Sequence, residues 1–463
     1  MKQYFIISSF SAISVFILFL IINIYLDLNR DVLQLKVHAL DNGLALTPPM
    51  GWMSWLKYAC NIDCVTYPNE CINEHLYREM VDHLVSDGYL ALGYSTVNID
   101  DCWSEKLREE EQPHRLVGNR NRFPSGIAEL VNYAHSKGVQ LGIYEDVGTL
   151  TCGGYPGTRS TDPGPNKTQH IDHTIVDAET FSSWGVDSLK LDGCYADVKQ
   201  YPQTYPEYTR ALARVKHKIV YACSWPAYLI NNLTDEDYAH IRSSCNYWRN
   251  YDDIEDSFVS VQSIIAYYRK HATTFIRYHG PGGWFDPDML IIGNDGLSFE
   301  QAKTQMAFWS LWSAPLLMSN DLRSIGKEFR EILQNRELIA IDQDPLGLMG
   351  QPVESVSKNN LEVWVKKLFL PSSNSSSESG KQWHPYVVLY YNKNIIGVPA
   401  IISHRLSDLI HDGLGPPQSV KYNIYDLYGD PTKVIATLPR DKNLTLRVKT
   451  SGSVRVVKLV PIF

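Results

Sequence analysis

Aspartate side chains gather where short apolar runs of the chain end. The set comprises Asp100, Asp101, Asp146, Asp192, Asp252, Asp253, Asp286 and Asp288, and it is accompanied by Tyr144, Lys190, Arg249, Trp52, Trp55, Trp103, Trp225 and Trp284. A single aspartate in such a position is more often the N-cap of the helix that follows. So many acids exceed what capping needs, and beside flat indole rings they suit a ligand with hydroxyl groups and C–H faces. The residues therefore predict a carbohydrate pocket.

A metal site is the main alternative chemistry for the same carboxylates. Several acids at successive strand ends, with Lys190 two residues before Asp192, could hold Mg²⁺ for the abstraction of a proton. The indoles, and Arg249 among the acids, favour a sugar over a hydrated cation. The segment His170–His173 is interpreted as a surface loop, because nothing near it in sequence completes a set of ligands. We expect neither a metal nor an organic cofactor.

The segment Cys223–Tyr228 raises a question of size. It follows an apolar run, and the small Ser224 and Ala227 stand among the large rings of Trp225 and Tyr228. Small side chains between large rings leave space. The residues alone leave two interpretations open, namely room for part of a ligand, or a strand that needs small residues for its packing.

The elements that position these side chains alternate along residues 50–321. Strand-like runs occupy 50–55, 95–103, 140–148, 188–195, 219–228, 246–254, 282–290 and 314–321, and intervening stretches such as 73–93, 124–138 and 256–271 have helical spacing. Eight strand–helix units are what a closed (β/α)₈ barrel requires, with polar residues at the carboxyl ends of the strands facing the mouth. The alternative, a doubly wound sheet, lacks support because no glycine-rich phosphate turn follows the first run. We predict an α/β fold with a TIM barrel.

The residue pattern of the chain changes after about residue 345. Short alternating runs follow one another at 361–368, 385–393, 422–429, 443–450 and 453–460, with no long helix among them. This pattern predicts an antiparallel β-sandwich. The serine-rich segment 371–381 is predicted to be a surface loop. The expected organisation is a leader over 1–39, the barrel over 40–345 and an all-β domain over 346–463.

The leader and the cysteines indicate the compartment. Lys2 precedes a nearly uncharged run, Tyr4–Leu26, which is long enough to span a bilayer and predicts a signal peptide or a signal anchor. Eight cysteines predict four disulfides in an oxidising compartment, whereas the C-x₂-C spacing typical of zinc sites does not occur. Glycosylation sequons stand at Asn166, Asn232, Asn374 and Asn443. A net charge of -8 without a basic stripe argues against a nucleic-acid partner.

Longer motifs resemble a known family. They are TPPMGWMSW (47–55), NIDDCW (98–103), LGIYEDVG (141–148), LKLDGCY (189–195), CSWPAY (223–228), WRNYDDI (248–254), GGWFDPDMLIIGN (282–294) and IDQDPLG (341–347). In order and spacing they are similar to the animal lysosomal α-galactosidase and α-N-acetylgalactosaminidase family, strongly over about 43–350 and loosely over the β tail. The resemblance implies a retaining exo-glycosidase that needs no cofactor. It also implies terminal α-GalNAc or α-galactose glycoconjugates as substrates, a lysosomal location and a homodimer.

The resemblance also implies a role for each matched residue. Asp192 matches the family's nucleophile and Asp253 its general acid/base, because the register of Arg249 places the acid at the second aspartate of the pair. The matched sugar contacts are Trp55, Asp100, Asp101, Tyr144, Lys190, Tyr228, Arg249 and Asp288, of which the two adjacent aspartates would hold O4 and O6. Two carboxylates about 5–5.5 Å apart then retain the anomeric configuration through a covalent intermediate. The ammonium of Lys190 would favour the ionised nucleophile.

The family's disulfide pairing would join the eight cysteines two by two. It would give Cys60–Cys102, Cys64–Cys71, Cys152–Cys194 and Cys223–Cys245. The third of these bridges would border the pocket and fix the loop that carries Asp192.

The resemblance gives the space at Ser224 and Ala227 a purpose. In this family the loop after the fifth strand faces C2 of the sugar, where α-galactosidases carry Glu and Leu and N-acetylgalactosaminidases carry Ser and Ala. Terminal α-GalNAc is therefore the expected substrate, with weaker action on α-galactose. An α-galactosidase is the alternative, followed by a membrane-tethered galactoside-binding protein without turnover. Two departures stand out: Glu145 is expected to add an acid near the mouth, and Phe285 replaces the usual Asn close to Asp288.

Overall fold

The computed structural model describes residues 39–111, 113–160, 171–357, 360–370, 384–393, 399–410, 420–450 and 452–462. The leader, the sequons at Asn166 and Asn374, His170 and the loop 371–381 lie outside the described residues, except for Ala39 at the end of the leader. Ala39–Phe463 is one compact unit. Within the described ranges, no helix combines the length and the apolar character that a membrane crossing needs.

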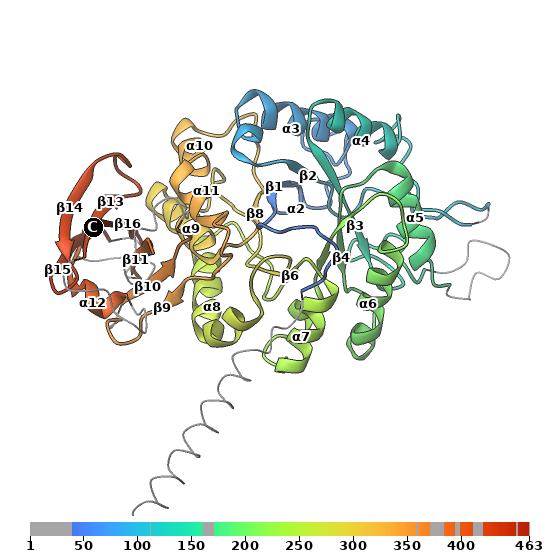
Figure 1. The fold of residues 1–463 in the computed structure, drawn as a ribbon. Helices are drawn as coiled ribbons and strands as arrows, with labels where there is room; N and C mark the ends of the chain where they lie inside the picture. The colour runs from blue at the N-terminus through green and yellow to red at the C-terminus, as the bar shows by residue number, and fades with distance from the viewer. Residues whose placement is uncertain are drawn as a thin grey trace, which may run out of the picture. The chain divides into compact units, whose positions relative to one another are not determined.

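Eight parallel strands form the first sheet, at the places that the sequence predicts (Figure 1). They are β1 (Met50–Met53), β2 (Thr96–Asn98), β3 (Gln140–Asp146), β4 (Ser188–Asp192), β5 (Val220–Cys223), β6 (Tyr247–Arg249), β7 (Trp284–Asp286) and β8 (Leu316–Met318). Neighbours in the sequence are neighbours in the sheet from β1 to β7, and β8 pairs with β1. This order confirms the (β/α)₈ barrel.

The barrel closes at a narrow seam between β7 and β8. Strand β7 ends at Asp286, because Pro287 has no N–H to continue a ladder. The chain returns to the sheet at Leu290, which forms an isolated parallel bridge with Met318. The Leu290 N–H donates to the carbonyl of Leu317 at 2.7 Å, and its carbonyl accepts from Ser319 at 2.9 Å. Two hydrogen bonds thus replace a full ladder at this edge.

Helices cover the outside of the strands (Figure 1). The main ones are α3 (Glu74–Ser86), α4 (Ile127–Ser136), α5 (Thr174–Trp184), α6 (Tyr201–Leu212), α7 (Asp235–Ser244), α8 (Phe258–Tyr278) and α9 (Phe299–Trp312). The helix expected over 73–93 is shorter than predicted. It begins after Asn73, whose side chain accepts the Leu76 N–H, and it ends at Ser86 because Gly88 has a φ of 84°. A short 3₁₀ helix, Leu90–Leu92, follows.

Antiparallel sheets form the C-terminal part of the described chain. A six-stranded sheet has the order β14 (Val434–Pro439), β13 (Lys421–Asp426), β16 (Val454–Ile462), β11 (Tyr386–Asn392), β10 (Leu361–Lys367) and β9 (Gln351–Pro352). A two-stranded sheet pairs β12 (Ala400–Arg405) with β15 (Asn443–Val448). Apolar side chains of both sheets, among them Val388, Ile424, Ile402 and Leu444, share one buried core. This arrangement confirms the predicted sandwich, and the exact domain boundaries stay a prediction.

The barrel and the six-stranded sheet meet at helix α9. The indole of Trp364 in β10 packs edge-on against Phe308 at 5.5 Å. Beside it, the buried ammonium of Lys366 donates to the carbonyl of Ile341 and to the hydroxyl of Ser313, both at 2.6 Å. Burial lowers the pKa of Lys366 to about 8. Burial disfavours this cation, and the barrel acceptors supply the hydrogen bonds that it needs there.

Candidate active site

A cavity of about 360 Å³ opens at the carboxyl ends of the barrel strands. The predicted site residues that line it are Trp55, Asp100, Tyr144, Lys190, Asp192, Ser224, Ala227, Tyr228, Arg249 and Asp253. Cys152, Cys194, Tyr251 and Asp252 complete the lining. Residues from strand ends β1 to β6 therefore converge on one space, as the parallel arrangement of the strands requires.

Asp192 ends strand β4 with both carboxylate oxygens occupied. The Tyr228 hydroxyl donates to Oδ1 at 2.7 Å, and the Tyr144 hydroxyl donates to Oδ2 at 3.1 Å. The backbone N–H of Gly193 adds a third bond to Oδ1 at 2.9 Å. Three donors thus hold the carboxylate in one orientation, which a nucleophile needs. Sequence reasoning named both tyrosines as sugar contacts and missed their role as partners of Asp192.

The ammonium of Lys190 contacts Asp100, and not the carboxylate of Asp192. Its Nζ lies 2.8 Å from Oδ2 of Asp100. Burial disfavours the charged ammonium, but Asp100 first and Asp192 second outweigh that effect and raise the pKa of Lys190. The interaction between the Lys190 charge and Asp192 is thus electrostatic, without a direct contact. Burial also raises the pKa of Asp100, although the ion pair opposes the shift.

Arg249, at the end of β6, binds two carboxylates on the other side of the cavity. One guanidinium nitrogen lies 3.0 Å from Oδ1 of Asp253, and the other lies 3.0 Å from Oδ2 of Asp288. The side chain of Asp253 is 74% exposed. The Arg249 charge lowers the pKa of Asp253, with a smaller effect from Lys190, against the opposing effect of burial. In the ligand-free protein Asp253 is therefore an ionised partner of arginine.

Two of the predicted sugar contacts lie behind the cavity lining. Asp101 is buried, and its Oδ2 accepts the backbone N–H of Gly153 at 2.6 Å. Asp288 is also buried, and it accepts the backbone N–H of Ile254 at 2.8 Å besides its ion pair. In the described structure these carboxylates hold loops, and their contact with a sugar stays a prediction.

Asp286 is a buried acid to which the sequence analysis gave no separate role. It ends strand β7, and its Oδ1 accepts the backbone N–H of Asp288 at 2.8 Å. Burial raises its pKa to about 7, against the opposing effect of Arg249. Its position two residues before Asp288 was visible in the sequence, but its burial was not.

The small residues of the segment Cys223–Tyr228 do face the cavity. Strand β5 ends at Cys223, and Trp225–Leu229 turn into a 3₁₀ helix that begins after Ser224. The predicted strand over 219–228 is therefore too long, because Pro226 fits the first turn of a helix and cannot donate to a ladder. Ser224 and Ala227 line the same cavity as Asp192 and Asp253.

Comparisons with known proteins agree with this geometry. Residues 47–344 match a family model described as alpha galactosidase A. The chain belongs to this family. An alpha-N-acetylgalactosaminidase of Gallus gallus is 43% identical over 415 residues, which cover 90% of this chain and 94% of that protein. Alpha-galactosidase A of Homo sapiens is 44% identical over 362 residues, which cover 78% of this chain and 77% of that protein.

A solved structure extends the likeness to the whole architecture. The crystal structure of alpha-galactosidase I from Mortierella vinacea matches with a TM-score of 0.74 and 27% identity, over 91% of this chain and 98% of that chain. The family resemblance and the fold predicted from the sequence are both confirmed. As members of this family are glycoside hydrolases, the chain is an enzyme of that class.

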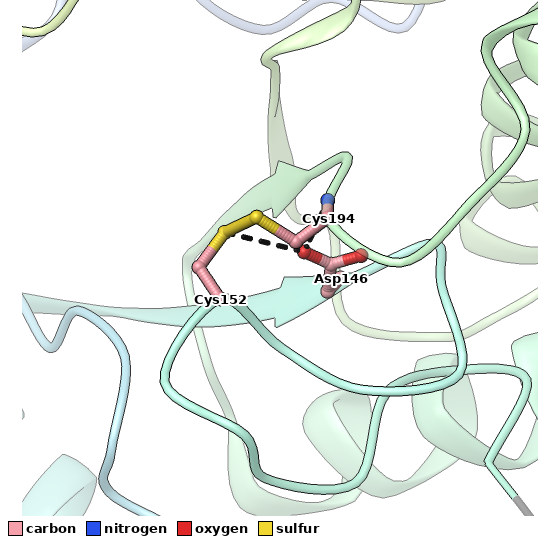
Figure 2. A group of neighbouring side chains, drawn as sticks. All are labelled: Asp146, Cys152 and Cys194. Carbon is pink, nitrogen blue, oxygen red and sulfur yellow. Dashed lines mark hydrogen bonds between the residues drawn. A yellow bond between two sulfur atoms is a disulfide. The ribbon is translucent and has the colours of Figure 1, made fainter.

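All eight cysteines of this family member are paired. The disulfides are Cys60–Cys102, Cys64–Cys71, Cys152–Cys194 and Cys223–Cys245, as the resemblance implies. Figure 2 shows the third bridge, which joins the loop after β3 to the turn after β4 beside Asp146. Asp146 accepts the backbone N–H of Cys194 at 2.8 Å, and burial followed by the charge of Asp192 raises its pKa well above the ordinary range. Because both sulfurs are bonded to each other, this group offers no thiolate to a metal.

The two expected departures from the family pattern lie away from the cavity. Glu145 belongs to β3, and its side chain is buried away from the cavity with its carboxylate 3.6 Å from the guanidinium of Arg108, so the expectation of an added acid near the mouth is wrong. Consecutive strand residues point to opposite faces, and Tyr144 already takes the cavity side. The side chain of Phe285, in β7, is likewise buried away from the cavity and stacks on Phe275 of α8 at 4.2 Å.

Proposed function

We propose that this protein is a retaining exo-α-N-acetylgalactosaminidase that removes terminal α-linked GalNAc from glycoconjugates. The observation that carries the proposal is the shared cavity, which combines two carboxylates, Asp192 and Asp253, with the small pair Ser224 and Ala227. The similar protein of Gallus gallus bears the name of that activity.

The two carboxylates divide the reaction between them. Asp192 attacks the anomeric carbon and forms a glycosyl ester, while Asp253 gives a proton to the departing oxygen. Asp253 then removes a proton from water, which cleaves the ester and restores the α configuration. No step needs a metal or an organic cofactor.

The Arg249–Asp253 ion pair sets a condition for this chemistry. Asp253 must begin protonated, yet the arginine lowers its pKa in the ligand-free protein. An acidic medium protonates Asp253 directly. A substrate that competes for the guanidinium does so by removing the charge that lowers the pKa of Asp253. The acidic medium suits a lysosomal enzyme that reaches its compartment through the secretory pathway. A homodimer is proposed for its assembly.

Selectivity at C2 follows from volume and from one hydroxyl. Ser224 is buried at the cavity wall, and no hydrogen bond of its hydroxyl is found among the described residues, so it can donate to an N-acetyl carbonyl. Ala227 leaves the adjoining space open. A pocket cut for the larger group still admits α-galactose with some loss of contact.

Paired substrates test the proposal. We expect p-nitrophenyl α-GalNAc to be hydrolysed with a higher kcat/KM than p-nitrophenyl α-galactoside, with net retention seen by NMR of the first product. Asp192→Asn should lower kcat by at least about 10³-fold while the variant still binds the sugar. A preference for the galactoside would support the alternative, an α-galactosidase, and an unchanged rate in the variant would refute the nucleophile assignment. Sugar binding without turnover in the wild type would support the third candidate, a galactoside-binding protein.

A further inference from the structure

Asp252 is a lining residue of the cavity for which the proposed mechanism has no use. It precedes Asp253 in the coil after β6, and its side chain is exposed. Its backbone carbonyl accepts a hydrogen bond from Arg249 at 3.0 Å, which fixes the main chain at this point. Arg249 binds the carboxylate of Asp253 and only the carbonyl of Asp252.

The other charged side chains that line the cavity have side-chain partners. Lys190 pairs with Asp100, Arg249 pairs with Asp253, and tyrosine hydroxyls hold Asp192. Across the described part of the chain, no cation lies within ion-pair distance of the Asp252 carboxylate. Asp252 is therefore a lining carboxylate that has neither an ion pair nor a side-chain hydrogen bond among the described residues.

The position of this charge relates it to the leaving group. In a retaining glycosidase the acid/base residue stands on the side where the aglycone departs. Asp252 is the chain neighbour of that residue and shares its cavity wall. An aglycone held by Asp253 thus passes close to the free carboxylate.

We propose that Asp252 is a specificity-determining residue of the aglycone side, one that favours leaving groups bearing an ammonium and disfavours anionic ones. The proposal rests on the proposed glycosidase activity and deepens it. Its substrate class is α-GalNAc linked to an aglycone with a nearby cationic nitrogen, such as the amino terminus of a short glycopeptide. Because the carboxylate is exposed, each permanent charge on the aglycone should change kcat/KM by about threefold at low ionic strength.

Three aryl α-GalNAc substrates of matched size test this inference. The aglycones are 4-(trimethylammonio)phenol, the isosteric neutral 4-tert-butylphenol and 4-sulfophenol, whose charges do not change with pH. Each kcat/KM is divided by that of the neutral substrate, and the ratios are compared between the wild type and Asp252→Asn, so that leaving-group reactivity cancels. The control is Asp441→Asn, an aspartate that is 70% exposed in the turn between β14 and β15.

We expect Asp252→Asn to lower the cation ratio and raise the anion ratio by about threefold each, and Asp252→Lys to reverse their order. The wild-type preference should shrink in 0.5 M NaCl, which a purely structural role of Asp252 would not cause. Equal ratios in the wild type and in Asp252→Asn, or equal changes in the Asp441→Asn control, would overturn the inference alone. Failure of the wild type to cleave the neutral substrate or either p-nitrophenyl sugar would instead overturn the proposed function.

Discussion

At the scale of single residues, two phenols hold the candidate nucleophile. Tyr228 and Tyr144 each donate to a different oxygen of Asp192, so the carboxylate has one orientation before a sugar arrives. Fixing a reacting group in advance reduces the reorganisation that the reaction requires. The exposed Tyr228 does this from the mouth, and the buried Tyr144 from the barrel.

Removing either phenol should slow the enzyme. A hydrogen bond to a charged group contributes about 1.5–3 kcal/mol, so Tyr228→Phe and Tyr144→Phe should each lower kcat/KM by about 10- to 100-fold. The assay is p-nitrophenyl α-GalNAc hydrolysis. Tyr195→Phe is the matched control, because Tyr195 is an exposed phenol next to the lining residue Cys194. Equal rates for the wild type and both test variants would mean that the two bonds are not used in the reaction.

The pair Ser224 and Ala227 carries the selectivity argument at the same scale. Exchanging both residues, Ser224→Glu with Ala227→Leu, fills the space expected at C2 and supplies a carboxylate for a 2-hydroxyl. We expect the kcat/KM ratio of α-GalNAc to α-galactose to fall by at least about 100-fold, mainly through loss of the larger substrate. Steady-state kinetics on both p-nitrophenyl sugars measure this. If the ratio stays constant, the cavity wall at these positions does not contact C2.

At the scale of elements, disulfides clamp the strand ends. Cys152–Cys194 and Cys60–Cys102 both close loops with a sequence separation of 42, and only the first has sulfurs at the cavity. In the chain-entropy description each contributes about 4 kcal/mol to the free energy of unfolding. The two bridges therefore differ in position and are alike in loop length.

This match allows a comparison between stability and catalysis. Replacing both cysteines of either bridge by serine should lower the unfolding free energy by a similar amount. Loss of Cys152–Cys194 should also lower kcat/KM by about tenfold or more, because it frees the turn after Asp192. Denaturant unfolding and kinetics on the purified variants are the measurements. An equal loss of kcat/KM in both variants would contradict a local role for the bridge at the cavity.

Most of the elements could be predicted from the sequence, because apolar runs ending in acids repeat with little interruption. All eight barrel strands lie where such runs were found. The errors came at Gly88 and Pro226, two local breakers that the apolar pattern ran across. Gly88 ended α3 early, and the strand expected to continue past Cys223 became a 3₁₀ helix.

The site was less accessible to sequence reasoning than the strands. Residue types at the strand ends placed Asp192 and Asp253 in one cavity, since parallel strands converge at one face. Which partner each charge selects was not visible. Lys190 pairs with Asp100, and Glu145 turns away to Arg108, because alternation along a strand and long-range burial decide both outcomes.

At the scale of the whole molecule, buried carboxyls make folding sensitive to pH. Burial raises the pKa values of Asp100, Asp101 and Asp288, and it raises that of Asp286 to about 7. A carboxyl whose pKa is higher in the folded state binds a proton more tightly there than in the unfolded chain. Its contribution to stability is therefore complete at low pH and is lost as the pH rises toward 7.

The contribution of Asp286 to the pH dependence of stability can be measured. Between its ordinary pKa of 3.8 and its folded pKa of about 7, ionisation costs about 4 kcal/mol of stability. We expect the wild type to have a lower Tm at pH 7.5 than at pH 5, and Asp286→Asn to reduce that difference, because asparagine keeps the bond to the Asp288 N–H without ionising. Asp441→Asn should leave the difference unchanged. An identical pH dependence of Tm in the wild type and Asp286→Asn would show that Asp286 does not titrate in this range.

The barrel seam has a consequence for how the molecule comes apart. A single bridge at Leu290 joins the β7 side of the sheet to β8, so we expect local opening to begin there. The amide hydrogens of Leu290 and Ser319 should then exchange with deuterium sooner than those inside β3 and β4. Asp288 and its ion-pair partner Arg249 lie near this seam, whereas Asp192 ends β4 within continuous ladders. Because Arg249 also holds Asp253, a partly opened molecule would lose the position of its proton donor, Asp253, while its nucleophile, Asp192, was still in place.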